Sequence, residues 1–225
     1  MKKLLVSVLL VACSAGMAMA TNYNPLTDWV DYPGAPDAWT YGFRIETASG
    51  SGVFGDFSPM EHVAAHWTGA PDGDAWRDPG EADHYTCSIW KINPWNGTNV
   101  GMMVWDTYAP VTRVTPEPGI YDLTGSFIGI GYASAFPVTN VYVIKNNTDV
   151  LFSSSVSDYV TPSPFDISNI NMQAGDYLEF VVGNTTTGGP EHRASLAADL
   201  VLVPEPVTMV LLGLGGLGLI RRRRA

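Results

Sequence analysis

From about residue 100 onward, the chain is a series of short runs in which apolar and polar residues alternate, separated by clusters of Gly, Pro, Asn and Thr. In one run, Tyr121, Leu123 and Phe127 fall on the same face of an extended chain. Two later runs repeat the alternation: Leu178, Phe180 and Val182, then Leu196, Ala198, Leu200 and Leu202. A period of two residues is typical of strands with one buried face, so the pattern predicts an all-β fold, either a β-sandwich or a barrel.

Local signals predict how these runs are connected. Residues 141–144 are apolar throughout, which suits a strand covered on both faces. The sequence Asn-Asn-Thr-Asp at 146–149 predicts a hairpin turn, and Ala-Gly-Asp at 174–176 predicts another turn. The apolar positions within 165–172 change from odd to even numbers, which a β-bulge would explain.

The N-terminal half has a different character. All seven tryptophans lie between Trp29 and Trp105, among Gly, Pro and Asp and with little periodicity. We therefore expect long loops around a few strands in this half. The 183 residues from 21 to 203 are enough for one domain with a real core.

Charge and cysteine content narrow the possible partners. Residues 21–203 hold 21 of the 22 acidic residues but only six of the twelve basic ones, which gives a net charge of −15. An acidic surface repels phosphate backbones, so nucleic acid is excluded as a partner, whereas divalent cations and uncharged glycans are tolerated. Cys87 is the only cysteine in this stretch, so no disulfide can form within it.

Residues 1–20 have the three parts of a secretory signal peptide. Two lysines follow Met1, an apolar run extends from Leu4 to Ala12, and Ala-Met-Ala ends at Ala20. We expect signal peptidase to cleave after Ala20 and to leave Thr21 first. The sequence Leu-Val-Ala-Cys ending at Cys13 also resembles a bacterial lipobox, so lipidation of Cys13 stays open as an alternative.

The C-terminus also has three parts in order: Pro204-Glu205-Pro206, an uncharged stretch over 207–220, and four arginines, Arg221, Arg222, Arg223 and Arg224. This arrangement resembles the PEP-CTERM sorting signal of Gram-negative and related bacteria. The resemblance implies that an exosortase, a membrane transpeptidase, recognises the Pro-Glu-Pro tripeptide and cuts near it. The arginines would stop the segment at the cytoplasmic side of the membrane and leave the body outside.

The length of the apolar stretch favours a transient anchor. Fourteen residues in a helix reach only about 21 Å, whereas the hydrocarbon core of a bilayer is about 30 Å thick. Flanking residues and local thinning can make up the difference. A permanent single-pass anchor without processing remains the alternative to a tail that is handed to a membrane enzyme.

The body carries a second resemblance. The sequences PGIYDLTGSF at 118–127, VYV at 141–143 and AGDYLEFVVG at 174–183 together resemble the β-sandwich body common among PEP-CTERM proteins, which is similar to jelly-roll carbohydrate-binding modules. We therefore expect a signal peptide at 1–20, a jelly-roll-like β-sandwich body at 21–203 with a loop-rich N-terminal half, and a sorting signal with a short apolar helix at 204–225.

Acidic residues supply the candidates for metal binding. Asp72, Asp74 and Asp78 lie in an oxygen-rich stretch that could hold calcium, although a solvated acidic loop is the favoured explanation of the stretch. His62 and His66 could present two imidazoles on one face of a helix, as in zinc sites, but no third ligand can be named. No esterase elbow, phosphate-binding loop or dinucleotide fingerprint is present in the sequence.

Exposed aromatic rings supply the candidates for glycan binding, because they can stack on the apolar face of a sugar. Trp76 lies among acidic residues and Trp95 lies in an Asn-Pro-Trp-Asn-Gly stretch, so these two are the most plausible contacts. For any one tryptophan, packing in the core or covering a sheet edge is the favoured alternative.

Two functional hypotheses follow. The first is a non-enzymatic surface or extracellular-matrix protein with no catalytic residues and no required cofactor, sorted by an exosortase and associated with exopolysaccharide. The second is a carbohydrate-binding module or carbohydrate-active enzyme. In either case the chain would be exported, held briefly at the inner membrane, and then released to the cell surface or beyond.

Overall fold

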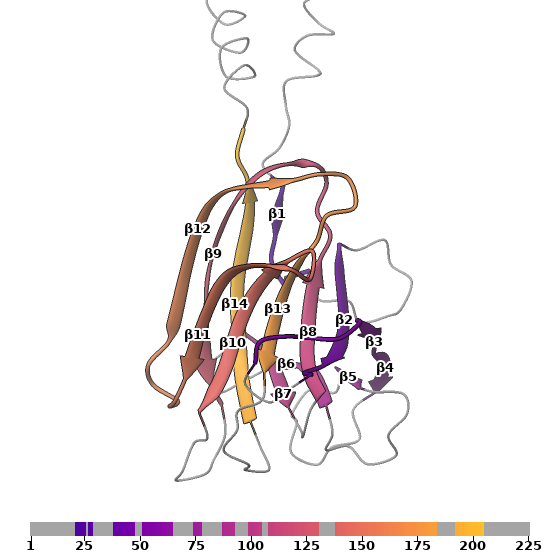
Figure 1. Ribbon diagram of the computed structural model, residues 1–225, viewed down its shortest axis with the longest axis vertical. Helices are drawn as coiled ribbons and strands as arrows, with labels where there is room; N and C mark the ends of the chain where they lie inside the picture. The colour runs from indigo at the N-terminus through magenta and orange to yellow at the C-terminus, as the bar shows by residue number, and fades with distance from the viewer. Residues whose placement is uncertain are drawn as a thin grey trace, which may run out of the picture.

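A computed structural model describes residues 21–25, 27–28, 38–47, 51–64, 74–77, 87–92, 99–104, 108–130, 138–183 and 192–204. Every regular element in these ranges is a β-strand, and all the strand pairs are antiparallel. The strands form two sheets that face each other (Figure 1). The prediction of an all-β sandwich is therefore confirmed.

The larger sheet has eight strands. Its order is β12 (Ser163–Met172), β9 (Gly119–Gly129), β14 (His192–Leu202), β7 (Asn99–Val104), β6 (Cys87–Ile92), β5 (Asp74–Arg77) and β4 (Glu61–Ala64). The eighth strand, β1 (Asn22–Tyr23), pairs with the last part of β14, whereas β7 pairs with its first part. Since β9 pairs with the other edge, the long strand β14 is bonded along both of its edges.

The smaller sheet has six strands. Its order is β11 (Asp149–Val156), β10 (Thr139–Lys145), β13 (Leu178–Gly183), β8 (Tyr108–Val114), β2 (Trp39–Ile45) and β3 (Ser58–Pro59). Strands β10 and β13 lie inside this sheet, so each is bonded to a neighbour on both edges.

The main core lies between the sheets and is built from the alternating residues. Leu123, Phe127, Phe180 and Leu196 are fully buried there. Phe165 of β12 lies among aromatic rings, with its centroid 5.7 Å from that of Phe127 and 6.1 Å from that of Phe180. The predicted inward faces are confirmed, since a strand with period two presents one side of the chain to the opposite sheet.

The prediction of a strand covered on both faces is also confirmed, for β10. Val141 and Val143 join the main core, whereas Tyr142 and Ile144 join a second apolar cluster on the outer side of the smaller sheet. Phe54 closes this cluster, with its ring centroid 5.4 Å from that of Tyr142. The segment after β2 thus forms a partial third layer, which the sequence pattern did not predict.

The predicted turns and bulge are present as well. Asn146 and Asn147 have φ angles of 51° and 65°, and the N–H of Thr148 donates to the carbonyl of Lys145, as in a type I′ hairpin turn. Gly175 has a φ of 86° in the turn before β13. The register of β12 against β9 shifts between Ile167 and Ile170, which confirms the β-bulge.

Short strands, with undescribed stretches between them, make up the described part of the N-terminal half. His62 lies in strand β4, so the idea that it shares a helical face with a second histidine is wrong. The described ranges hold no helix that is long and apolar enough to cross a membrane. The expected signal peptide and the expected apolar helix lie outside the described residues.

Candidate functional site

The best-defined candidate site is the end of the sandwich where the described chain begins and stops. Strand β1 and the C-terminal end of β14 lie at the same end of the two-layer body (Figure 1). The N–H of Leu202 donates to the carbonyl of Thr21 at 3.1 Å, and the N–H of Val203 donates to the carbonyl of Ile120 at 2.8 Å. We call the region formed by residues 21–24, 117–121 and 199–204 the sorting end.

Tyrosine packing supports the sorting end from inside. The rings of Tyr23 and Tyr121 lie 6.1 Å apart between centroids. The hydroxyl of Tyr121 donates to the carbonyl of Glu117 at 2.9 Å, and the hydroxyl of Tyr23 accepts from the N–H of Glu117 at 3.3 Å. Burial, followed by the nearby Tyr23, raises the pKa of Tyr121 far above its ordinary value, so this hydroxyl stays protonated.

No spacer separates the folded body from the expected sorting motif. Leu202 is the last residue of β14 and packs against the main core. Val203 is half-buried and Pro204 is exposed. Glu205, Pro206 and the four terminal arginines lie outside the described residues. The tripeptide therefore begins two residues after the last core strand.

The other candidate residues are only partly described. Asp74 and Trp76 lie in strand β5, where Trp76 is opposite His62 on one side and Ile89 on the other. Asp72, Asp78 and Trp95 lie outside the described residues. Among the described residues, no three metal-ligating side chains form a group that could hold an ion.

A buried ion cluster lies on the outer side of the smaller sheet, and the sequence analysis did not predict it. Glu179 of β13 is completely buried and accepts from two arginines. Arg44 of β2 reaches it at 2.9 Å, and Arg113 of β8 reaches it at 2.7 Å. Arg44 also donates to the carbonyl of Gly55, which fixes the covering segment onto the sheet.

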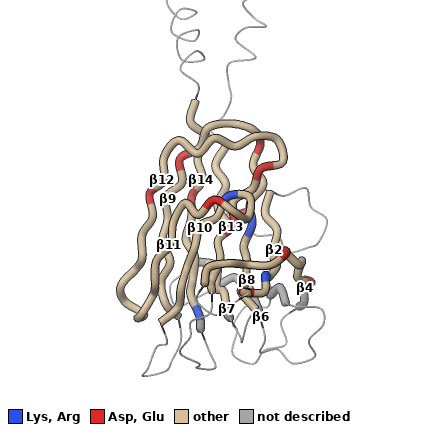
Figure 2. Tube along the Cα trace, viewed as in Figure 1, with Lys and Arg blue, Asp and Glu red and all other residues tan. Residues whose placement is uncertain are grey.

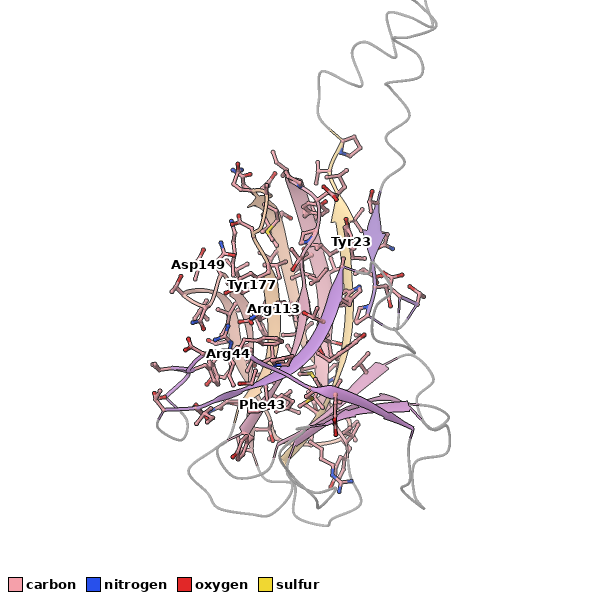
Figure 3. All side chains as sticks on the ribbon, turned by 90° about the vertical axis from the view of Figure 1, so that its right-hand side faces the viewer. Tyr23, Phe43, Arg44, Arg113, Asp149 and Tyr177 are labelled. Atoms are coloured by element: carbon pink, nitrogen blue, oxygen red, sulfur yellow. The ribbon has the colours of Figure 1, made fainter. Side chains whose placement is uncertain are left out.

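Aromatic rings complete this cluster. The guanidinium carbon of Arg113 lies 3.6 Å from the ring centroid of Phe57 and 4.2 Å from that of Tyr177. Arg44, Arg113 and Tyr177 gather on one side of the body, whereas Tyr23 lies on the other side (Figure 3). Stacked guanidinium groups with bidentate carboxylate contacts form rigid cross-links, so this cluster is best explained as structural.

One signal in the sequence could have revealed the cluster. Glu179 interrupts the apolar run of β13, whose residues are buried on both faces. A carboxylate in such a strand needs a buried cation, because an unpaired buried charge is very costly. The identity of its partners could not be predicted, since Arg44 is 135 residues away and Arg113 is 66 residues away.

Two other carboxylates hold turns. Asp176 accepts from the backbone N–H of Gln173, from Lys145 and from Asn146, and these bonds lower its pKa to about 2. Asp158 accepts from the N–H groups of Thr161 and Val160, which lower its pKa as well. Such carboxylates remain ionised at neutral pH and are poorly suited to donate a proton.

Acidic positions outnumber basic ones in the upper part of the body, towards the sorting end (Figure 2). Asp199 of β14 accepts from the side-chain amide of Asn24 at 2.8 Å, and Asp122 of β9 accepts from the N–H of Asn169 at 2.9 Å. These contacts give individual carboxylates a structural role while the surface as a whole stays acidic.

Comparison with known proteins identifies the C-terminal segment. Residues 202–224 match the family model described as the PEP-CTERM protein-sorting motif. The match begins at Leu202, so the motif overlaps the last residue of β14. No curated protein matches the chain significantly in sequence.

Solved structures with similar backbones have low TM-scores. TmCBM61 in complex with β-1,4-galactotriose is 14% identical, with a TM-score of 0.35, and the match covers 55% of this chain and 85% of that one. CBM36 in complex with calcium and xylotriose is 14% identical, with a TM-score of 0.31 and coverage of 50% and 91%. CBM35 from Paenibacillus barcinonensis is 15% identical, with a TM-score of 0.28 and coverage of 82% and 99%.

Similarity at this level says nothing about a ligand of this chain. The family match at the C-terminus is specific, and the antiparallel two-sheet body is established by its own strand pairing. The chain therefore carries a PEP-CTERM protein-sorting motif at residues 202–224, and the last strand of its all-β sandwich runs directly into that motif.

Proposed function

We propose that this protein is a non-enzymatic component of the cell surface or extracellular matrix, released from its tail by an exosortase and associated with exopolysaccharide. The observation that carries the proposal is the direct continuation of core strand β14 into the sorting motif. A molecule that holds the tail also holds the sandwich, because the two are one covalent chain, and the single residue Val203 between β14 and Pro204 keeps the body next to the motif. Processing at the motif would then decide whether the body stays at the membrane or leaves it.

The use of the described carboxylates supports a structural role. Glu179 neutralises two buried arginines, Asp176 and Asp158 hold turns, and Asp199 holds the N-terminal strand. A glycoside hydrolase needs two carboxyl groups about 5–10 Å apart that are available to substrate. Each of these four is already committed to bonds within the protein.

The acidic surface supports association with uncharged polymers or with polymers bridged by cations. A net charge of −15 over residues 21–203 repels other polyanions in the absence of cations. Exopolysaccharide would therefore be contacted through neutral sugar units or through divalent ions.

Mass spectrometry of the protein taken from the cell surface tests the processing. We expect the surface form to begin at Thr21 and to lack residues 207–225. Recovery of surface protein with these residues still attached would overturn exosortase processing. A purified body that hydrolyses any member of a polysaccharide panel would overturn the non-enzymatic part of the proposal.

A dedicated carbohydrate-binding module is the second candidate. The position of Trp76 in β5 of the larger sheet, close in sequence to Asp72, Asp74 and Asp78, favours it. In this case Trp76 and Trp95 would stack on sugar units, and the aspartates could hold a calcium ion. Glycan-array binding that is lost in Trp76→Ala or Trp95→Ala, or on removal of calcium, would favour this candidate over the first.

A further inference from the structure

The residues just before the sorting motif are held from both sides. On one side, Asn22 and Tyr23 of β1 pair with Val201 and Leu200 of β14. The same edge is extended by the bond from the N–H of Leu202 to the carbonyl of residue 21. On the other side, residues 200–202 pair with residues 121–123 of β9, and the N–H of Val203 donates to the carbonyl of Ile120 in the same strand. The backbone N–H groups of Leu202 and Val203, the two residues before Pro204, are thus both hydrogen-bonded within the body.

Strand β1 is attached by few contacts, but these contacts are specific. Tyr23 packs on Tyr121 and accepts from the N–H of Glu117. The side-chain amide of Asn24 donates to Asp199 at 2.8 Å. A two-residue strand at the edge of a sheet belongs to the least stable part of a fold, so it can open while the core remains intact.

The side chain of Leu202 packs closely against Gly119, the first residue of β9. A Cβ atom placed on Gly119 would lie 2.5 Å from Cδ1 of Leu202 and 3.3 Å from the ring of Tyr121, so the end of the leucine side chain would have to move. The ring of Tyr121 packs on Tyr23, so the same change also presses on the contact that holds β1. The position therefore offers a second way to loosen the segment that leads into the motif.

The hydrogen bonds that hold residues 202 and 203 conflict with cleavage of the chain near the sorting motif. An enzyme that cuts a peptide bond binds several residues around it, commonly as an extended strand that uses their backbone N–H and C=O groups. In the closed body, the N–H groups of Leu202 and Val203 are already bonded within the protein. The rate of cleavage should then follow the fraction of molecules in which this segment is open.

We propose that strand β1 is a latch that controls the access of the processing enzyme to the sorting motif. The latch is formed by residues 21–24, and it covers one edge of residues 200–202, whose other edge pairs with β9. Thr21 is also the first residue expected after removal of the signal peptide, so the mature N-terminus itself would close the latch. The inference rests on the proposed function, because it concerns processing at that motif.

The test follows tail removal in the full-length chain, expressed in a Gram-negative host that carries an exosortase. Pulse-chase labelling and mass analysis give the rate at which the tail is lost from the wild type, Tyr23→Ala, Asn24→Ala and Gly119→Ala. Leu151→Ala serves as the matched control, because Leu151 is a partly buried core residue like Tyr23 but lies in β11 of the other sheet.

We expect Tyr23→Ala and Asn24→Ala to lose their tails about fivefold faster than the wild type, as the loss of one hydrogen bond would predict, and Gly119→Ala to lose its tail faster than the wild type as well. The control should match the wild type. Equal or slower tail loss in Tyr23→Ala and Asn24→Ala would overturn the latch and leave the sorting function intact. If the wild type and every variant keep their tails, the proposed processing fails instead.

Hydrogen exchange tests the latch without the enzyme. In the full-length wild type, the amide of Leu202 should exchange slowly, and in Tyr23→Ala it should exchange about fivefold faster. The amide of Val203, which donates to Ile120 of β9, and the amides in β13 should be unchanged. Equal exchange at Leu202 in the two proteins would overturn the latch even if the tail is never removed.

Discussion

Replacing Glu179 by glutamine tests whether the buried ion cluster is a main source of rigidity in the smaller sheet. Glutamine keeps the volume of the side chain and one acceptor oxygen, but it removes the negative charge. Arg44, whose side chain is only 2% exposed, then loses its counter-ion within the protein. Arg113 is 18% exposed and can recover part of its hydration.

The size of the effect follows from the burial of Arg44. Removing one partner of a buried ion pair costs about 3–5 kcal/mol, because the remaining charge stays desolvated. Arg113 reaches solvent and glutamine still accepts one bond, so we expect about 3 kcal/mol for Glu179→Gln. In a domain of 150–250 residues, this corresponds to a fall in Tm of roughly 6–12 °C.

Urea and thermal unfolding followed by circular dichroism measure this loss. The matched control is Glu117→Gln, at an exposed position, which should stay within about 0.5 kcal/mol of the wild type. A triple variant, Arg44→Met, Arg113→Met and Glu179→Leu, removes every charge of the cluster and should recover most of the stability. If Glu179→Gln unfolds within about 1 kcal/mol of the wild type, the cluster does not have the energetic role argued from its burial.

Three further predictions follow from the packing. In Gly42→Ala, the new Cβ would lie 2.3 Å from the ring of Phe57, so the urea midpoint should fall by the equivalent of about 1–3 kcal/mol. Phe165→Ala should cost about 3–5 kcal/mol, measured in the same way, because it empties the aromatic centre of the core. Hydrogen bonds, most strongly the one from the backbone N–H of Gln173, lower the pKa of Asp176 from 3.8 to about 2. The stability that the charge of Asp176 adds is therefore complete above pH 3.8 and is lost towards pH 2. The Tm difference between the wild type and Asp176→Asn should be constant near neutral pH and should shrink steadily from pH 3.8 to pH 2. A difference that stays constant over this range would contradict the role given to this carboxylate.

Much of the body could be predicted from local pattern. The inward faces of β9, β13 and β14, the hairpin at 146–149 and the bulge in β12 all appear where the alternation and turn residues indicate. The physical reason is that side-chain alternation and positive φ angles are properties of a few neighbouring residues. The N-terminal half lacked this periodicity, and its strand order could not be predicted.

The contacts that define the sorting end and the ion cluster lie beyond the reach of local pattern. Both bring together residues that are far apart in the chain: Thr21 meets Leu202, and Arg44 meets Glu179. Sequence spacing carries no information on such contacts, because strand order and register are settled by how two whole sheets pack. The covering segment after β2 is a further example, since Phe54 and Phe57 have no pattern that marks them as a lid over the sheet.

By itself, the sequence determined the all-β class, the acidic charge, the positions of several turns and the sorting motif at the C-terminus. These depend on composition and on neighbouring residues. Only the tertiary structure decided that β1 lies beside the last strand and that β14 runs into the motif without a spacer. Backbone hydrogen bonds between distant segments produce this arrangement, and through it the N-terminus comes to hold the residues that precede the sorting motif.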